Sequence, residues 1–145
     1  MDDVLLNKAA IIERCLQRVD EEYRGHEQEL ADDYTRQDAI VLNLLRACEA
    51  SIDAAMHVVR VRRLGIPQRS RDAFEMMHRA RLLDSTLNER LQAMVGFRNI
   101  AIHRYREIEL PILRAILERR LGDLRAFAGR LIELAGEESK PGDER

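Results

Sequence analysis

Proline, glycine and cysteine are scarce in this chain, with three, seven and two copies among 145 residues. Charged residues make up 34% and hydrophobic residues 46% of the sequence, a balance that favours amphipathic helices packed against one another. The two cysteines, Cys15 and Cys48, fall on apolar stripes of expected helices, so we expect buried, reduced thiols and no disulfide framework. No pattern of histidines or carboxylates accompanies them, and no metal site or cofactor is predicted.

No stretch approaches the run of about 18 apolar residues that a membrane-spanning helix needs. The chain begins Met1-Asp2-Asp3 and lacks the basic segment and apolar run of a signal peptide. We therefore expect a cytoplasmic protein that makes no membrane contact. The formal charge of −2 argues against a protein that coats nucleic acid over its whole surface, but it allows a local basic patch.

Hydrophobic residues recur at spacings of three and four in five parts of the chain, which is typical of amphipathic helices. These parts are residues 5–23, 35–64, 70–82, 85–105 and 111–131. The predicted fold is all-α, an up-and-down bundle of about five helices, assembled as a homodimer. One domain is expected over residues 1–135, without repeats or strands. Residues 136–145 have nothing to bury and are expected to be disordered.

Local signals suggest where the middle helices begin and end. Thr35 and Asp38 form an acidic variant of a capping box, which predicts the start of the second helix. Gly65 followed by Pro67 predicts its end, because glycine favours the C-terminal turn and proline cannot continue a helix. Ser70 is expected to cap the third helix.

The sequence from Arg98 to Tyr105, RNIAIHRY, carries the residues with the clearest chemical potential. RNA supplies its own nucleophile, the 2′-hydroxyl, so a metal-independent ribonuclease needs only a proton acceptor, a proton donor and cations for the phosphate. An imidazole titrates near neutral pH, which suits His103 to acid or base work. The Arg98 guanidinium can hold two phosphate oxygens, and Asn99 can orient either partner.

Helical geometry sets a condition on this motif. Positions five apart on an ideal helix are rotated by roughly 140°, so Arg98 and His103 would not share a face, whereas Arg98 and Tyr105 would. Convergence on one phosphate therefore requires a bend near Ile102 or a second chain. A two-fold dimer would also supply two histidines to one cleft. Alternatively, the motif is a solvated surface, with Arg98 paired to a carboxylate and His103 facing the helix dipole.

The longer stretch from Met94 to Tyr105, MVGFRNIAIHRY, closely resembles the signature of HepT-like toxins, a branch of the HEPN superfamily. In that superfamily an arginine, four to six residues and a histidine form the ribonuclease motif, and HepT-like proteins add a tyrosine two positions later. Residues 43–55 resemble the family's second helix, and residues 64–67 resemble its usual connection. The likeness continues in order and spacing from about residue 36 to 130.

This resemblance implies an endoribonuclease toxin encoded beside an MntA-like minimal nucleotidyltransferase antitoxin. In such pairs the antitoxin transfers AMP to the motif tyrosine, here Tyr105. AMP beside Arg98 and His103 would add negative charge and bulk where the RNA phosphate must lie. The resemblance implies tRNA or mRNA as the substrate, and the sequence does not choose between them.

Two carboxylates four residues apart, Glu49 and Asp53, are expected on one face of the second helix. Either could orient Arg98 or His103, or simply form a solvated acidic stripe. Asp53 is favoured as the orienting residue, because the resemblance includes that acidic position.

Arginines gather in residues 60–81, which hold seven of them against two carboxylates. We expect this segment, represented by Arg60 and Arg63, to contact RNA or an acidic partner, although an ordinary solvated surface fits the same pattern. Arg104 and Arg106 flank the motif histidine and could add to the field that attracts phosphate.

A rival function belongs to a different class. Some HEPN proteins are non-catalytic modules that bind a nucleotidyltransferase and present its substrate, and in that case the motif would be an interface. The presence of Arg98, Asn99, His103 and Tyr105 together favours the ribonuclease, because a binding module has no need of all four. A purely structural helical dimer is the third possibility.

Overall fold

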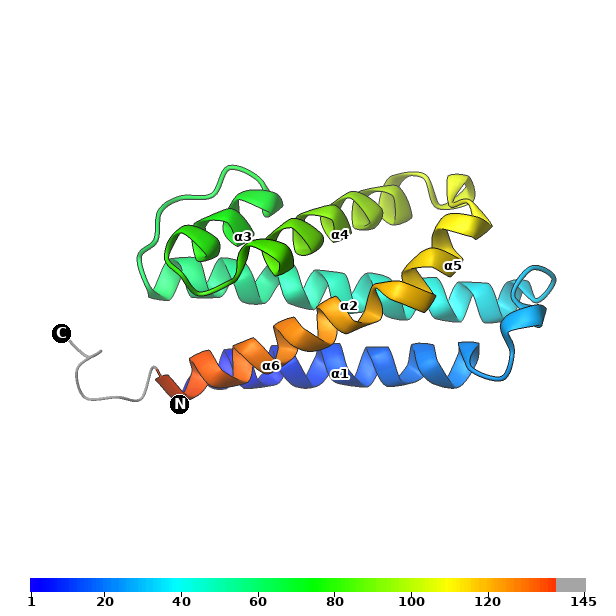
Figure 1. Ribbon diagram of the computed structural model, residues 1–145, viewed down its shortest axis with the longest axis horizontal. Coiled ribbons are helices and arrows are strands. Elements are labelled where there is room, and N and C mark those ends of the chain that lie inside the picture. Colours follow the sequence, from blue (N-terminus) through cyan, green and yellow to red (C-terminus); the bar gives the residue numbers. More distant parts are fainter. Residues whose placement is uncertain (138–145) are drawn as a thin grey trace.

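Two long helices form the base of the bundle in the computed structural model, which describes residues 1–137. Helix α1 (Asp3–Tyr23) and helix α2 (Tyr34–Val61) lie side by side, joined by a loop with a short 3₁₀ turn, η1 (Glu27–Glu29) (Figure 1). Helix α6 (Leu121–Glu137) packs along α1, so α1 is covered on two sides. Its buried stripe explains this position: Leu5, Ala9, Ile12, Leu16 and Val19 recur at helical spacing.

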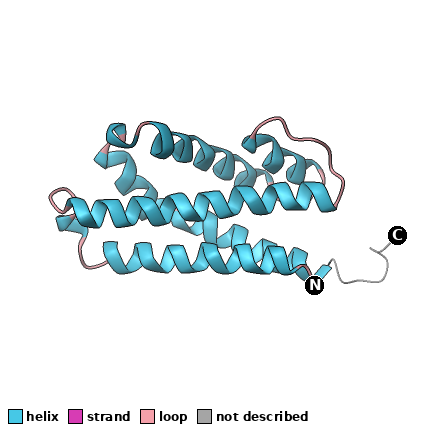
Figure 2. Cartoon of the chain, turned by 180° about the vertical axis from the view of Figure 1, so that it is seen from behind, coloured by secondary structure: helices cyan, strands magenta, loops and turns pink. Residues whose placement is uncertain are grey.

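Helices α3 (Ser70–Arg79) and α4 (Ser85–His103) cover α2. These two helices also pack on each other, and the 3₁₀ turn η2 (Tyr105–Glu107) leads into helix α5 (Leu110–Arg119). Helices and loops account for all of residues 1–137, which confirms the predicted all-α class (Figure 2). No helix in that part of the chain has the length and apolar character to cross a bilayer.

Phe74 of α3 and Phe127 of α6 contact each other in the core. Their rings meet edge to face, with centroids 5.6 Å apart and planes at 71°. Both side chains are fully buried, and such aromatic pairs add attraction beyond the area they bury. Cys15 and Cys48 are buried free thiols, as predicted.

The fifth predicted helix is in fact two helices. The helix is interrupted at Arg120, the C-cap of α5, and α6 begins at Leu121. Periodicity could not reveal this break, because buried Leu117, Leu121 and Leu124 keep helical spacing across it. Helix α6 also extends to Glu137, two residues into the segment expected to be disordered. The rest of that segment, residues 138–145, lies outside the described part of the chain.

Two predicted caps are wrong. Helix α2 starts at Tyr34, one residue before Thr35, and its N-cap is Asp33, whose carboxylate accepts a hydrogen bond from the Arg36 N–H at 3.0 Å. Asp38 therefore lies inside the helix and is free for another contact. Ser70 is the first residue of α3 and does not cap it, and the Asp72 carboxylate accepts from the Arg69 N–H at 3.0 Å instead.

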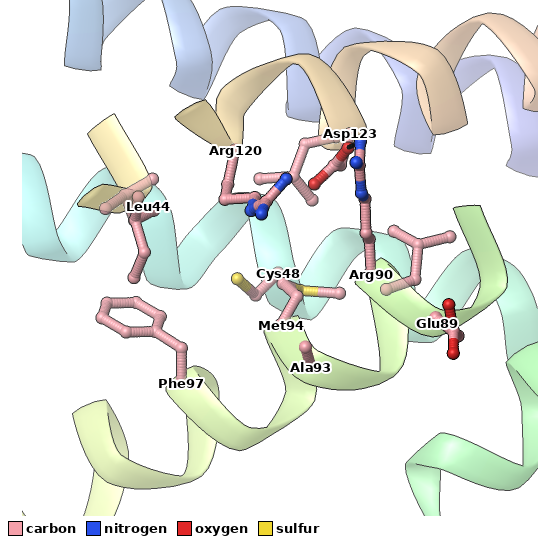
Figure 3. Close-up of a pocket in the computed structure, with 12 residues that line it drawn as sticks. Leu44, Cys48, Glu89, Arg90, Ala93, Met94, Phe97, Arg120 and Asp123 are labelled. Atoms are coloured by element: carbon pink, nitrogen blue, oxygen red, sulfur yellow. Dashed lines mark hydrogen bonds and ion pairs between the residues drawn. The ribbon is translucent and has the colours of Figure 1, made fainter. Parts of the chain in front are cut away.

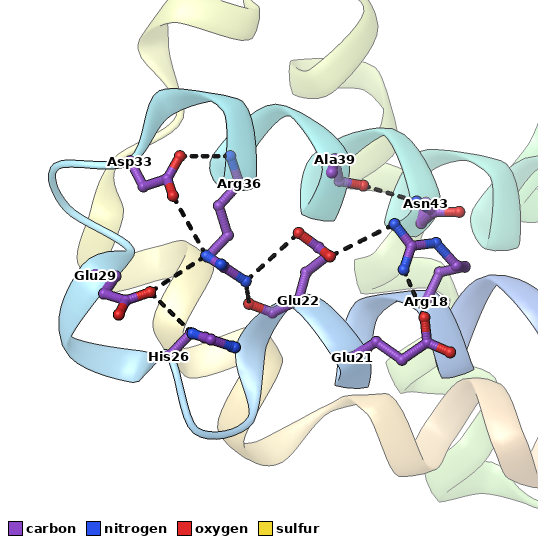
Figure 4. Close-up of polar contacts among 9 residues, drawn as sticks. All are labelled: Arg18, Glu21, Glu22, His26, Glu29, Asp33, Arg36, Ala39 and Asn43. Atoms are coloured by element: carbon purple, nitrogen blue, oxygen red, sulfur yellow. Dashed lines mark hydrogen bonds and ion pairs between the residues drawn. The ribbon is translucent and has the colours of Figure 1, made fainter.

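Arg36 fastens the beginning of α2 to the end of α1 (Figure 4). Its guanidinium donates to the Glu22 carbonyl oxygen at 2.7 Å and lies 3.4 to 3.6 Å from the carboxylates of Glu22, Asp33 and Glu29. The side chain is 18% exposed, so these contacts are shielded from water better than a surface ion pair. The first turns of α2 are thereby held in place.

Replacing Arg36 by Met should lower the free energy of unfolding by about 1–3 kcal/mol, because a carbonyl and three carboxylates lose a partly buried donor. The measurement is the midpoint of urea denaturation. Arg18→Met is the matched control, since Arg18 also pairs with Glu22 but is 44% exposed, and its loss should lower the denaturation midpoint less than the loss of Arg36. Equal losses of unfolding free energy in the two variants would show that the Arg36 contacts stabilise the fold no more than an exposed ion pair does.

Candidate functional site

The motif lies at the C-terminal end of α4, which stays helical through His103. The Arg104 N–H donates to the Ile100 carbonyl at 2.7 Å and closes the last turn. The bend near Ile102 that would bring Arg98 and His103 of one chain together is therefore absent from this helix. Ala101 is the buried residue of the turn, while Ile100, Ile102 and His103 are exposed.

Arg98 is held by three neighbours. Its Nε lies 2.8 Å from Glu49 Oε1 of α2 as an ion pair, without the alignment of a hydrogen bond. Its Nη1 donates to Asn99 Oδ1 at 2.7 Å, and its Nη2 donates to the Ser70 hydroxyl at 3.0 Å. The Arg98 side chain is only 18% exposed. Helices α2, α3 and α4 together fix the direction of this guanidinium.

The preference for Asp53 over Glu49 as the orienting carboxylate is corrected by these contacts. Asp53 lies one helical turn beyond Glu49, is 58% exposed, and pairs with Lys8 of α1 at 3.5 Å. Glu49 contacts Arg98 instead. Four residues make slightly more than one turn, so the two carboxylates point toward different neighbours once α1 and α4 have packed on α2.

The Tyr105 side chain points toward α2. Its hydroxyl donates a hydrogen bond to Asp38 Oδ1, 67 residues earlier in the chain. Burial and the neighbouring Asp38 carboxylate raise the pKa of Tyr105 to about 12, because both disfavour the phenolate. The common helical face expected for Arg98 and Tyr105 is not formed, because α4 ends at His103 and Tyr105 lies in η2, although α2 supplies a carboxylate to each of them.

His103 and Asn99 are both exposed. Asn99 accepts from Arg98, so its orienting role toward the arginine fits the geometry. Within residues 1–137 no hydrogen bond or ion pair engages the His103 ring, which leaves both nitrogens available to a ligand. The site thus combines a fixed guanidinium with an unengaged imidazole at the end of the same helix.

The arginines expected to contact RNA are spread over the molecule. Arg104 and Arg106 are exposed beside the motif, and Arg104 lies 3.8 Å from Glu107. Arg60 contacts His57 at 3.0 Å near the other end of α2, roughly 33 Å along the helix from Asp38 at about 1.5 Å per residue. Arg63 follows that helix and is exposed. Only part of the predicted basic segment therefore approaches the motif.

Arg71 is the member of this segment that reaches α4. Its guanidinium lies over Gly96, where an added Cβ would be 3.0 Å from Arg71 Nη2. The neighbouring residue, Ser70, accepts the hydrogen bond from Arg98. Arg71 is exposed and has no ion pair within the described chain. The sequence did not place Ser70 or Arg71 beside the motif, because only the packing of α3 on α4 brings them there.

A pocket of about 240 Å³ lies between α2, α4, α5 and α6 (Figure 3). Its walls are mainly apolar, and charged side chains lie at its edge, where Arg90 contacts Asp123 at 3.3 Å. Cys48 lines it, but burial raises the pKa of this thiol to about 12, so the reactive thiolate is not formed near neutral pH. The pocket offers no evident nucleophile.

Comparisons with known proteins agree with this arrangement. Residues 12–131 match the model of the family described as ribonuclease HepT-like. The mRNA nuclease HepT of Shewanella oneidensis is 42% identical over 127 residues, which cover 88% of this chain and 95% of that protein.

Solved structures show the same fold. A tri-AMPylated Shewanella oneidensis HEPN toxin, in complex with its MNT antitoxin, superposes with a TM-score of 0.85 at 41% identity. A toxin–antitoxin complex with AMP-PNP superposes with a TM-score of 0.86 at 40% identity. Both matches cover 92% of this chain and 99% of the other chain. From the matched residues and the Arg98–His103–Tyr105 geometry, this chain is a member of the HepT-like ribonuclease family.

Proposed function

We propose that this protein is the toxin of a toxin–antitoxin pair, a metal-independent endoribonuclease that is neutralised when AMP is attached to Tyr105. The observation that carries this proposal is the guanidinium of Arg98, fixed by Glu49, Asn99 and Ser70 at the end of a helix that also presents an unengaged His103. The complexes of related toxins with nucleotidyltransferase antitoxins support the pairing.

In the proposed reaction His103 accepts the proton of the 2′-hydroxyl, or donates one to the leaving 5′-oxygen. The 2′-oxygen attacks the phosphorus, the bond to the 5′-oxygen breaks, and the products carry a 2′,3′-cyclic phosphate and a 5′-hydroxyl. Arg98 binds the phosphate oxygens and stabilises the charge that grows on them. Glu49, Asn99 and Ser70 hold Arg98 in one orientation, so it pays little entropy when RNA binds.

A homodimer would solve the geometric problem of the motif. Arg98 faces α2 and α3, while His103 lies five residues further along an unbent helix and points elsewhere. One chain also offers only one motif histidine, although the reaction uses a base and an acid. Ile100 and Ile102 are 41% and 47% exposed beside the motif, and a second copy would cover this apolar surface.

The proposed substrate is RNA in the cytoplasm, where the partner nucleotidyltransferase would also act. The curated relative is named an mRNA nuclease, which makes mRNA the first substrate to test. Neutralisation follows from electrostatics: AMP on Tyr105 would place a phosphate near Arg98 and His103 and exclude the RNA phosphate by charge and by bulk.

The test is to incubate purified, unmodified protein with total RNA in excess EDTA and to analyse the fragment ends. Cleavage that leaves cyclic phosphates and 5′-hydroxyls is the expected result. A strict need for magnesium, or 5′-phosphate ends, would contradict the mechanism. Intact mass must show that the protein carries no AMP, and absence of cleavage by such protein would favour a non-catalytic binding module.

Arg71 should contribute to RNA binding as an unpaired cation beside the motif. We expect Arg71→Ala to weaken binding of a non-cleavable RNA about three- to tenfold and to reduce the salt dependence by about one ion. Filter binding at several salt concentrations measures both quantities. Arg79→Ala, on the same helix but paired with Glu75 at 3.1 Å, is the control and should change little. An unchanged salt slope in Arg71→Ala would place the RNA elsewhere.

A further inference from the structure

The contact between Tyr105 and Asp38 joins the proposed modification site to a residue that the ribonuclease mechanism does not use. Tyr105 is 43% exposed, so its ring is accessible at the surface while its hydroxyl donates to the carboxylate on α2. Among residues 1–137 this is the carboxylate that the Tyr105 hydroxyl contacts. Asp38 is itself exposed and has no cation paired with it there.

Asp38 is held in a fixed place. It lies in the first turns of α2, a helix whose start is fixed by the Asp33 cap and by the contacts of Arg36 with the end of α1. Arg36 is two residues away and turns toward α1, which leaves Asp38 on a different side of the helix. The carboxylate therefore contacts the tyrosine from a helix whose start is held in place.

We propose that Asp38 is the general base for nucleotidylation of Tyr105, so that the acceptor chain supplies the base for its own modification. This inference rests on the proposed function. In the step, Tyr105 Oη attacks the α-phosphorus of ATP, and a new P–O bond forms as the bond between the α-phosphorus and the bridging oxygen breaks. Pyrophosphate leaves with the bond electrons, and the phenolic proton passes to Asp38.

The state of the tyrosine explains why a base is needed. With a pKa of about 12, the phenol is protonated near neutral pH and cannot react as a preformed phenolate. Its proton must be removed while the P–O bond forms, when the phenol becomes more acidic. An aspartate that accepts the hydroxyl hydrogen bond is correctly placed for this, and aspartate serves the same purpose toward hydroxyl acceptors in protein kinases.

The proposal also separates the first AMP from any later one. An AMP attached to a previous AMP would be joined to a nucleotide hydroxyl, because the Tyr105 oxygen is already esterified. Asp38 should therefore control attachment to the tyrosine and have no comparable effect on further extension.

The experiment measures single-turnover AMP transfer from MgATP to the full chain by its cognate nucleotidyltransferase, with intact mass spectrometry resolving each added AMP. Asp38→Asn keeps the shape of the side chain and an oxygen that accepts the hydroxyl, but it removes the basic carboxylate. We expect the first transfer to slow at least about tenfold. Asp32→Asn is the charge-matched control and should react like wild type, since Asp32 is exposed just before α2.

Comparison of wild type with Tyr105→Phe separates failure of the proposed function from failure of this inference. Wild-type protein that takes up AMP while Tyr105→Phe does not establishes the acceptor. If Tyr105→Phe is modified like wild type, or wild type is not modified at all, the proposed function fails and this inference falls with it. If Tyr105 is the acceptor and Asp38→Asn reacts at the wild-type rate, the inference alone is overturned, because a simple tether would survive this substitution.

Folding of the variant is checked by its far-ultraviolet circular dichroism and by the midpoint of its urea denaturation. Removal of the Asp38 charge should lower the pKa of Tyr105 from about 12, visible in the ultraviolet titration of tyrosinate. Should Asp38→Asn prove misfolded, Asp38→Ala with added formate replaces it, and formate should restore part of the lost rate. Absence of rescue in folded Asp38→Ala would count against a base at this position.

Discussion

RNA cleavage should fall by about 10²- to 10⁴-fold when His103 is replaced by alanine, because the reaction loses the group that moves its protons. The substitution should leave the fold intact, since His103 is exposed at the end of α4 and makes no side-chain hydrogen bond or ion pair in the described chain. The measurement is the rate of cleavage of a defined RNA in excess EDTA, together with growth arrest when the protein is expressed without its antitoxin.

His26→Ala is the matched control for this experiment. His26 is also a surface histidine, paired with Glu29 at 2.9 Å in the loop after α1, and its loss should leave cleavage within about twofold of wild type. Undiminished cleavage by His103→Ala would remove the histidine from the mechanism. Equal losses in both variants would indicate a general effect of removing surface histidines.

The second large effect is expected for Arg98→Lys, which keeps the charge but loses the planar fork. Lysine cannot contact Glu49, Asn99 and Ser70 in the same way, nor bind two phosphate oxygens side by side. We expect kcat to fall about 10²- to 10³-fold, as when a donor to a developing oxyanion is removed. Steady-state kinetics on a short RNA would show the loss mainly in kcat, because the arginine acts on charge that appears in the transition state.

Arg90→Lys provides the comparison on the same helix. Arg90 pairs with Asp123 at the edge of the pocket, at 3.3 Å, and takes no part in the motif. It should cleave like wild type. A change confined to KM in Arg98→Lys would mean that Arg98 only binds RNA, and Glu49→Gln should then also affect KM alone.

The helices themselves were predictable because apolar residues at helical spacing record which side of each segment is buried. The shared helical face expected for Arg98 and Tyr105 did not form, because α4 ends at His103, before Tyr105. The break at Arg120 was not predictable either, because the buried stripe of leucines runs through it unchanged. Periodicity reports burial, and a change in helix direction can leave burial as it was.

The polar partners of the motif were harder to predict. Asp38 has the spacing of a capping residue from Thr35, and only the packing of η2 against α2 shows that it contacts a tyrosine 67 positions later. Glu49 and Asp53 look equivalent in sequence, and the neighbours supplied by α1 and α4 distinguish them. Side chains whose role depends on contacts distant in sequence leave no local signal.

The arrangement of α1 between α2 and α6 has a consequence for synthesis on the ribosome. The Asp2 N–H donates to the Ala135 carbonyl oxygen at 3.2 Å, so the beginning of α1 is paired with the last turns of α6. The motif leaves the ribosome before α6 does, yet α1 stays partly uncovered until α6 is made. The bundle closes only after α6 has been made, so the motif emerges from the ribosome well before a folded nuclease can exist.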